Sequence, residues 1–340
     1  MLDVGNYKLL TEYLVERGIA GEPASLLIEA LPGGVSNTVL KITCDKGRFV
    51  LKQALARLKV SSEWTADVER ANVEKKALKF LPQLIPGFTP ALVYEDEQNC
   101  LFVMECAPEG SVTWKSKLLA GECDPGIARQ VGAVLARIHQ GSHDLEVGSE
   151  DSGMVRAQFG DRKFFHQLRI APFFEFLKEK YPSLQQAIDA HIAASLGREL
   201  SLVLGDYSPK NILVHGQNII AIDFEVIHYG DPSFDLGFLS THLFLKSVRD
   251  PTKRDLYFEL LRETMAAYFS QIHFIDRKAL EMFAVQQLAW ILLARMDGKS
   301  PAEYITDEKK KQFIRLSVRE ILDRRMATYE EVIDFFEKQN

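Results

Sequence analysis

Two carboxylates and one amide stand out in the middle of the chain because they flank short apolar runs. The segment 202–214 contains Asp206 and Asn211, and the run 219–222 ends at Asp223. A short polar turn joins the two runs, so we expect a hairpin that brings the three polar side chains to one end. Polar groups at the ends of buried strands need partners, and these oxygen ligands suit a hard cation such as Mg²⁺.

Each of these residues also has an ordinary structural explanation. Asp206 could form a turn after Gly205, Asn211 could cap the start of a strand, and Asp223 could cap the end of one. The explanation is weaker for the three together, because a simple hairpin has no need to bring three hard-oxygen side chains to one place. The pattern therefore favours a site.

The elements that must position these residues fall into two parts. The first part reads mostly as strands, at 26–31, 38–43, 48–55, 91–94 and 100–106, with one helix at 62–81 that Pro82 is expected to stop. After a break at residues 107–110 the chain is mainly helical, at 127–140, 164–180, 253–272, 277–296 and 310–338. We predict an α+β fold with a β-rich lobe at 1–107 and an α-rich lobe at 108–340.

Composition limits the class of protein. The chain has 340 residues, of which 46% are hydrophobic and 26% charged, so it is too apolar for a disordered protein and long enough for two cores. The formal net charge of -6 argues against binding to nucleic acid or to an anionic membrane. A small phosphorylated ligand is not excluded, because it needs only a local cationic spot.

Cysteine usage and the N-terminus indicate a compartment. The four cysteines, Cys44, Cys100, Cys106 and Cys123, form no C-x-x-C pair, so we expect free thiols in a reducing environment. The N-terminus has no basic and apolar signal sequence, and the longest apolar run, 288–294, is too short to span a bilayer. The expected location is cytoplasmic.

The order of these residues resembles the catalytic loop of the protein-kinase-like superfamily. That pattern is H-x-D-x-x-x-x-N followed by D-F-G, and here it stands as Asp206 to Asn211 and then Asp223-Phe224-Glu225. The glycine directly before the aspartate, Gly205, and the proline three residues after it, Pro209, resemble the loop pattern of the small-molecule branch of this superfamily. That branch contains aminoglycoside phosphotransferases, choline and ethanolamine kinases and methylthioribose kinases. The segment 229–236 is similar to aminoglycoside phosphotransferase-like enzymes. The resemblance implies a bilobal protein-kinase-like fold with a small antiparallel sheet.

Two departures from the superfamily pattern concern the catalytic loop. Leu204 replaces the first histidine, a mainly structural position, so the change affects packing more than chemistry. Ser208 stands where protein kinases have lysine and aminoglycoside enzymes have histidine. Lys210 either supplies the missing charge or faces solvent, and the sequence leaves both options open.

The resemblance implies that the first lobe binds ATP. The loop 31–38 would cover the phosphates, with Gly33 and Gly34 allowing close approach and Ser36 and Asn37 adding donors, although such a loop is commonly only a hairpin turn. By the same resemblance Met104 is the gatekeeper of the adenine site. The carbonyl of Glu105 and the amide of Ala107 would bind the base.

A lysine in the third strand would reach the α- and β-phosphates. Lys52 and Val50 share a face, so Val50 would line the adenine site, unless Lys52 is an ordinary exposed lysine. The helix should offer a glutamate to Lys52. We favour Glu74 over Glu69, although a surface pair of Glu74 with Arg70 is a serious alternative.

The predicted function is ATP-dependent phosphorylation of a hydroxyl on a small molecule. Asp206 would orient the hydroxyl and take its proton, while Mg²⁺ held by Asn211 and Asp223 neutralises the phosphates. The alternative is a nucleotide-binding pseudokinase with a regulatory or scaffold role. ATP consumption with any acceptor separates the two. Asp235 is expected to anchor the catalytic loop.

The acceptor side has weaker signals. Glu225 would hold a second Mg²⁺ or face the acceptor, and Asp231 would line the same cleft or form a turn with Pro232. Arg169 would clamp an anionic acceptor or pair with an acid in the core. His242 is more readily explained as a packed helix residue. No acidic cluster is evident beyond Glu225 and Asp231, so we predict a small acceptor that is not a polycation and no aminoglycoside resistance.

Overall fold

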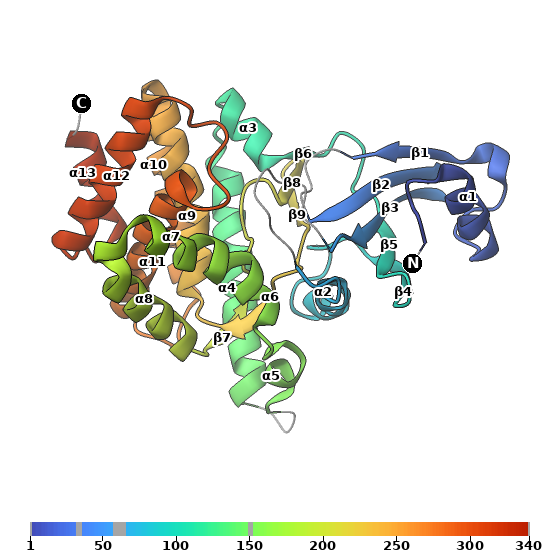
Figure 1. The fold of residues 1–340 in the computed structure, drawn as a ribbon, viewed down its shortest axis with the longest axis horizontal. Coiled ribbons are helices and arrows are strands. Elements are labelled where there is room, and N and C mark those ends of the chain that lie inside the picture. The colour runs from blue at the N-terminus through green and yellow to red at the C-terminus, as the bar shows by residue number, and fades with distance from the viewer. Residues whose placement is uncertain (1, 32–35, 57–65, 149–151, 339–340) are drawn as a thin grey trace. The chain divides into compact units, whose positions relative to one another are not determined.

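The structure is a computed structural model that describes residues 2–31, 36–56, 66–148 and 152–338. The chain divides into two compact units, one of residues 1–110 and 220–225 and the other of residues 111–219 and 226–340 (Figure 1). The first division falls at residue 110, where the sequence indicated 107. The return of residues 220–225 to the first unit was not expected from the sequence.

The first unit is built on a five-stranded antiparallel sheet with the strand order β1-β2-β3-β5-β4. The order follows from two hairpins, because β2 pairs with β3 and β4 pairs with β5, and β3 joins the hairpins by pairing with β5. The central strand β3 is buried over its second half. The strand bounds are Leu27–Ala30 (β1), Asn37–Cys44 (β2), Gly47–Ala54 (β3), Leu92–Asp96 (β4) and Leu101–Glu105 (β5).

Two helices pack on this sheet. Helix α1, Tyr7–Glu16, places Leu10 and Leu14 in one apolar core with the buried strand residues Leu40, Ile42, Leu51, Leu101 and Val103. Helix α2, Arg70–Leu84, contacts β3, β4 and β5 and buries Ala77, Leu78 and Leu81. Helix α1 was not predicted, and a short 3-10 turn at Pro23–Ser25 follows it.

The predicted helix 62–81 was wrong at both ends. Helix α2 begins at Arg70, and Pro82 lies inside it, two residues before its end at Leu84. Inside a helix a proline lacks the N–H donor and its ring crowds the carbonyl of the residue four positions earlier, here Leu78, and α2 continues for only two residues past Pro82.

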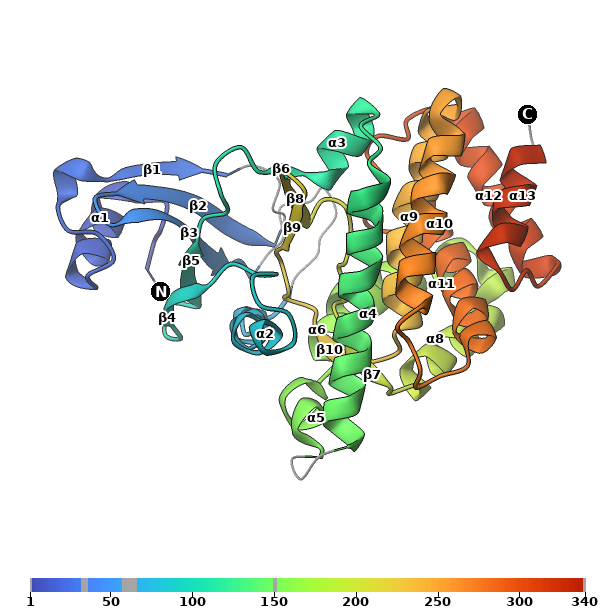
Figure 2. The same ribbon diagram turned by 180° about the vertical axis from the view of Figure 1, so that it is seen from behind.

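The second unit is mainly helical (Figure 2). Its α-helices are Trp114–Ala120 (α3), Pro125–Val147 (α4), Met154–Phe159 (α5), Lys163–Phe165 (α6), Phe176–Lys180 (α7), Gln185–Gly197 (α8), Ser233–Arg249 (α9), Arg254–Phe269 (α10), Arg277–Asp297 (α11), Glu308–Asp323 (α12) and Tyr329–Lys338 (α13). A π-helical stretch, His166–Glu175, connects α6 to α7, and 3-10 turns lie at Pro182–Leu184 and Pro251–Lys253.

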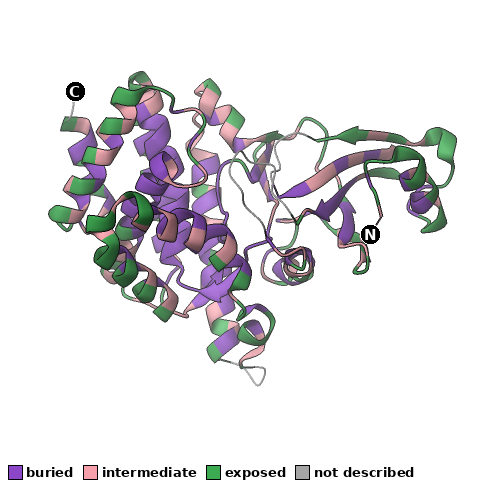
Figure 3. Cartoon of the chain, viewed as in Figure 1, coloured by how far each residue is buried: buried purple, intermediate pink, exposed green. Residues whose placement is uncertain are grey.

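Helices α9 and α11 form the core of this unit, and both are mostly buried (Figure 3). By length and composition alone α11 could cross a membrane, but 72% of its apolar stretch is buried in the unit, which is the setting of a core helix. The four cysteines are free thiols.

Short strands frame the predicted catalytic loop. Strand β7, Ser201–Val203, pairs with β10, His228–Gly230. Strands β6, Val112–Thr113, β8, Ile212–His215, and β9, Asn218–Ala221, form a separate small sheet in which β8 lies between the other two. The predicted hairpin is therefore β8 with β9, and Asp206 follows a strand that belongs to another sheet.

Two helical predictions also needed correction. The predicted helix 164–180 contains the π-helical stretch, in which Pro172 removes a backbone donor. The predicted helix 310–338 is two helices, because residues 324–328 break it and Arg325 has a φ of 53°. Helix α13 begins with a capping box, in which Thr328 accepts from the amide of Glu331 and the Glu331 carboxylate accepts from the amide of Thr328.

Candidate active site

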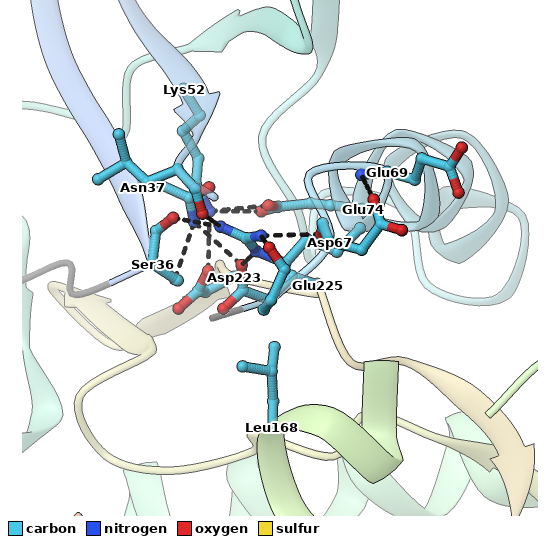
Figure 4. A network of polar contacts seen from close by, with 12 residues as sticks. Ser36, Asn37, Lys52, Asp67, Glu69, Glu74, Leu168, Asp223 and Glu225 are labelled. Atoms are coloured by element: carbon cyan, nitrogen blue, oxygen red, sulfur yellow. Dashed lines mark hydrogen bonds and ion pairs between the residues drawn. The ribbon is translucent and has the colours of Figure 1, made fainter. Parts of the chain in front are cut away.

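Lys52 lies at the centre of a buried network in the first unit (Figure 4). Its amino group donates to both carboxylate oxygens of Glu74, at 2.7 and 2.8 Å, and to Oδ1 of Asp223 at 2.8 Å. Lys52 and Glu74 are buried, at 5% and 1% exposure, while Glu69 is exposed. Of the two glutamates considered, Glu74 is therefore the partner of Lys52.

The charges in this network are strongly coupled. Burial favours the neutral amine of Lys52, but the carboxylates of Asp223, Glu74 and Glu225 outweigh it and raise the pKa of Lys52 above its ordinary value. Burial also raises the pKa of Glu74, against the opposing charge of Lys52. Lys52 is accordingly a fixed cation on the central strand, which is the charge that a phosphate requires.

Glu225 belongs to an adjoining network that the sequence did not reveal. Its Oε2 accepts from Nε of Arg70 at 3.0 Å and from Nδ2 of Asn37 at 3.1 Å. Arg70 is fully buried and also donates to the carbonyl oxygens of Leu55, Asp67, Ala66 and Ser36. The proposed surface pair between Arg70 and Glu74 was wrong, and Glu225 serves the first unit as a counter-charge for Arg70.

The other predicted nucleotide contacts lie in or beside this sheet. Val50 is buried in β3 and pairs with Met104 of β5. Glu105 ends β5 with an exposed side chain, and Ala107 is partly exposed after it. Ser36 and Asn37 are buried, and Asn37 donates to the Ser36 hydroxyl at 3.1 Å. Gly33 and Gly34 lie outside the described residues.

The predicted catalytic loop of the second unit is held from below by Asp235. The Asp235 carboxylate accepts from the amides of Leu204 and Gly205, at 2.7 and 2.8 Å, and contacts the ring of His139 at 3.2 Å. The expected anchoring role of Asp235 is confirmed. Gly205 has a φ of 70°, and a Cβ there would approach the Val226 carbonyl to 2.9 Å, so this turn requires glycine.

Asp206 follows this turn and is held by three side chains. Asn211 donates to Oδ2 at 2.8 Å, Lys210 approaches Oδ2 at 3.0 Å, and Arg169 approaches Oδ1 at 3.0 Å. Arg169 also donates to the Gly205 carbonyl at 2.8 Å. The charge of Lys210 is therefore directed to Asp206. Of the two roles considered for Arg169, the structure shows the second, a pair with an acid of the core.

The remaining predicted acceptor residues are placed differently. Asp231 is buried, accepts from Arg198 at 2.8 Å and accepts from the amide of Ser233, the first residue of α9, at 3.0 Å. Asp231 is thus a structural residue of the second unit, and not an open carboxylate. Ser208 is fully buried, and no hydrogen-bond partner of its hydroxyl is found among the described residues.

The donor atoms of Asn211 and Asp223 suit a hard cation. The amide nitrogen of Asn211 is committed to Asp206, which leaves the carbonyl oxygen as its acceptor. Within the described part of the chain, no group of three His, Cys, Asp or Glu side chains is arranged to hold a metal by itself. Taken one by one, a carboxylate and an amide oxygen are ligands of the kind that Mg²⁺ accepts, together with phosphates and water.

Comparison with solved structures defines the class of fold. Amicoumacin kinase hAmiN in complex with AMP-PNP, Ca²⁺ and Ami has a TM-score of 0.58 at 15% identity, covering 94% of this chain and 95% of that one. Choline kinase from Cryptosporidium parvum Iowa II has a TM-score of 0.58 at 14% identity, covering 95% and 98%. The fold is the bilobal, protein-kinase-like α+β fold of small-molecule kinases, as predicted.

Sequence comparison gives the family. The model described as the phosphotransferase enzyme family matches residues 27–274. A methylthioribose kinase of Bacillus cereus (strain B4264) is 27% identical over 278 residues, covering 76% of this chain and 70% of that protein. The chain therefore belongs to the phosphotransferase enzyme family, and it is a small-molecule kinase that uses an alcohol group as acceptor.

Proposed function

We propose that this protein transfers the γ-phosphate of Mg-ATP to a hydroxyl of a small molecule that is not a polycation. The observation that carries the proposal is the buried cation of Lys52, held between Glu74 and Asp223 on the central strand of the first unit. A cation kept there at the cost of burial is suited to the α- and β-phosphates of the nucleotide. Val50, Met104, Glu105 and Ala107 are proposed to contact the adenine.

Asp206 is the proposed base. It would accept a hydrogen bond from the acceptor hydroxyl, orient the oxygen toward the γ-phosphorus and take the proton as the new P–O bond forms and the bond to ADP breaks. The hydrogen bond from Asn211 fixes the orientation of the carboxylate, and Arg169 and Lys210 form ion pairs with its two oxygens. Asp223 and Asn211 are the proposed ligands of Mg²⁺, which when bound neutralises phosphate charge.

Two substitutions test the proposal by separating these roles. Asp206→Asn is expected to lower turnover by about 10³-fold or more while AMP-PNP binds with nearly unchanged affinity, because the base does not touch the nucleotide. Asp223→Asn is expected to lose Mg²⁺-dependent AMP-PNP binding as well. Turnover is measured as ADP release over an acceptor panel, and binding by calorimetry. Equal loss of binding in both variants would contradict the assignment.

The acceptor class has its own test. Buried Asp231 pairs with Arg198, and Glu225 pairs with Arg70, so neither offers an open carboxylate to a polycationic ring. We expect no phosphorylation of kanamycin above the rate of ATP hydrolysis without acceptor. Phosphorylation of kanamycin as fast as that of the best small hydroxyl compound in the panel would overturn this part of the proposal.

A further inference from the structure

One face of helix α9 carries chemistry that the proposed function does not use. Phe238, His242 and Lys246 are spaced four residues apart and therefore lie on the same side of the helix. Lys246 is only 1% exposed, and its amino group donates to the carbonyl of His242 at 3.2 Å. No carboxylate lies within ion-pair distance of Lys246 among the residues that the structure describes.

Two further cations meet Lys246 from other elements of the second unit. Lys246 and Lys115 of α3 both lie over the ring of Tyr304, at 5.3 and 5.6 Å from its centroid. Arg295 of α11 donates to the hydroxyl of Ser300 at 2.9 Å, but its Nε is buried with no hydrogen-bond partner in the described chain. We call Lys115, Lys246, Arg295 and Tyr304 the basic cluster.

Electrostatics shows how closely these groups are packed. Burial, followed by the positive charges of Lys115, Arg295 and Arg249 against the charge of Glu303, lowers the pKa of Lys246 to about 7. Burial and the charges of Lys246, Arg295, Lys210 and Lys115 also lower the pKa of His242. Glu303, which precedes Tyr304 in the chain, pairs with Lys115. Glu303 acts on Lys246 and Arg295 only from a distance, because neither of them forms an ion pair with a carboxylate among the residues that the structure describes.

The basic cluster is continuous with the catalytic loop. Lys210, which contributes to the field at His242, forms an ion pair with Asp206 at 3.0 Å. The guanidinium of Arg169, the other ion-pair partner of Asp206, lies 5.4 Å from the ring centre of Phe238. The Phe238 ring in turn meets the His242 ring edge-on at 5.3 Å. A path of direct contacts thus leads from the base to the unpaired cations.

The pairing of these cations differs from that of other arginines in the second unit. Elsewhere in the same unit, partly buried arginines are paired with buried carboxylates, as Arg198 is with Asp231 and Arg315 is with Asp297. Keeping an unpaired cation out of water is unfavourable, and a ligand of opposite charge would offset this cost. Arg295 Nε and the Tyr304 hydroxyl are buried and have no hydrogen-bond partner among the residues described, and both are donors of the kind that an anion would satisfy.

We propose that the basic cluster binds a negatively charged group of the acceptor, so that the substrate is an alcohol that also carries a phosphate or a carboxylate. The inference rests on the proposed function, because it assigns the acceptor to the side of Asp206. The ammonium of Lys246 and the guanidinium of Arg295 supply the charge, and Tyr304 supplies a neutral donor. A neutral acceptor leaves both cations without an opposite charge. The basic cluster therefore favours anionic acceptors over neutral ones.

Matched acceptors test the inference directly. ADP release is measured with ribose 5-phosphate against ribose, with glycerol 3-phosphate against glycerol, and with glycerate against glycerol. The anionic member of at least one pair is expected to have a kcat/KM at least tenfold above its neutral counterpart. The phosphate and carboxylate arms distinguish the two anions. Equal or faster turnover of the neutral members overturns the inference while leaving the proposed kinase activity intact.

Variants locate the anion. Lys246→Met keeps the length and volume of a buried side chain and is expected to raise KM for the anionic acceptor at least tenfold with kcat changed less than threefold. Lys115→Met, at a partly exposed position, is expected to raise KM to a smaller extent. The control is Lys278→Met, which removes the same charge from an exposed position at the start of α11. A parallel fall of kcat in Lys246→Met, with KM unchanged, contradicts the assignment.

A binding measurement decides the matter if no compound in the panel is phosphorylated. Inorganic phosphate is titrated into the full chain with saturating AMP-PNP, which occupies the nucleotide site, and binding is followed by calorimetry. Phosphate is expected to bind the wild type and Lys278→Met, and to bind Lys246→Met at least tenfold more weakly. No phosphate binding, or equal binding to all three proteins, overturns the inference. Failure of the kinase proposal is distinct, because Asp206→Asn would then leave ATP consumption unchanged.

Discussion

The network around Lys52 in the first unit and the surroundings of Asp206 and Lys246 in the second unit differ in how their buried charges are paired. In the first unit the buried cations Lys52 and Arg70 each contact carboxylates, supplied by Glu74, Asp223 and Glu225, whereas the amino group of the buried Lys75 has no hydrogen-bond partner among the described residues. In the second unit the carboxylate of Asp206 has two cations beside it, and in the basic cluster Lys115 pairs with Glu303 while Lys246 and Arg295 form no ion pair among the described residues. A closed network holds its geometry before any ligand arrives, whereas an unbalanced one has charge left over to bind a ligand.

The histidines sharpen this contrast. All eight lie between residues 139 and 273 and outside the segment 220–225, so the first unit contains none. Burial, opposed by hydrogen bonds, lowers the pKa of His191 and of His228 to about 4, and burial also lowers the pKa of His242. The second unit therefore has neutral histidines in its core. Its stability is expected to depend on pH in the range where histidines titrate, and the first unit has no histidine that would do the same.

The largest expected effect concerns the closed network. Arg70→Met leaves the buried carboxylate of Glu225 without its cation and is expected to lower the free energy of unfolding by about 3–5 kcal/mol. The control is Arg48→Met, which breaks an exposed ion pair with Glu109 and should cost less than about 1 kcal/mol. Urea unfolding monitored by circular dichroism measures both. Similar losses in the two variants would show that the buried pair of Arg70 and Glu225 stabilises the first unit no more than an exposed ion pair does.

Acidification is expected to act on the second unit. The pKa of His228 is about 4 in the folded protein and about 6.5 in the unfolded chain, so between these values the unfolded state binds more protons. Stability that is complete above about pH 6.5 is therefore lost as the pH falls toward 4. At pH 4.5 the loss is roughly 2–3 kcal/mol for each such histidine.

Hydrogen exchange read by mass spectrometry can place this loss in the chain. Peptides of β7, β10 and α9 are expected to lose protection between pH 6.5 and 4.5 before peptides of β2 and β3 do, after correction for the intrinsic pH dependence of exchange. His228→Phe, which retains the stacking on Phe165, should reduce the pH dependence. Loss of protection in the β2–β3 hairpin at a higher pH than in β7, β10 and α9 would contradict the prediction that acid destabilises the second unit first.

The smallest expected effect concerns the nucleotide. Lys52→Ala should weaken ATP binding at least tenfold, or about 1.4 kcal/mol, because the phosphates lose their cation. Folding should suffer less than binding, because Glu74, whose pKa is already raised by burial, can take up a proton when Lys52 is absent. Lys76→Ala, at an exposed position of α2, is the control. Unchanged ATP affinity and turnover in Lys52→Ala would show that the nucleotide assignment is wrong.

The sequence predicted those parts of the molecule that depend on local patterns. The strands of the first unit alternate or are apolar and end at turns, so β2, β3 and β5 lie within one or two residues of their expected positions. The Lys52–Glu74 pair was predictable because strand and helix periodicity place both side chains inward. The anchor at Asp235 was predictable from the family motif.

The remaining features depend on contacts between distant segments. Glu225 stands beside a predicted metal ligand, and nothing in its neighbours along the chain shows that Arg70, 155 residues earlier, is its partner. Helix α9 has no polar face to show helical periodicity, because nearly every residue in it is buried. The break before α13 did carry a local signal, the Thr328–Glu331 capping box, which could have been recognised from the sequence.

The return of residues 220–225 to the first unit limits how this gene can be divided. A fragment that ended at residue 110 would keep the whole sheet with α1 and α2 but would lose Asp223 and Glu225. Exchange of the first 110 residues between two related genes would combine one parent's Arg70 with the other parent's residue 225. These two positions must therefore be inherited together, and the first unit cannot be moved as a single continuous module.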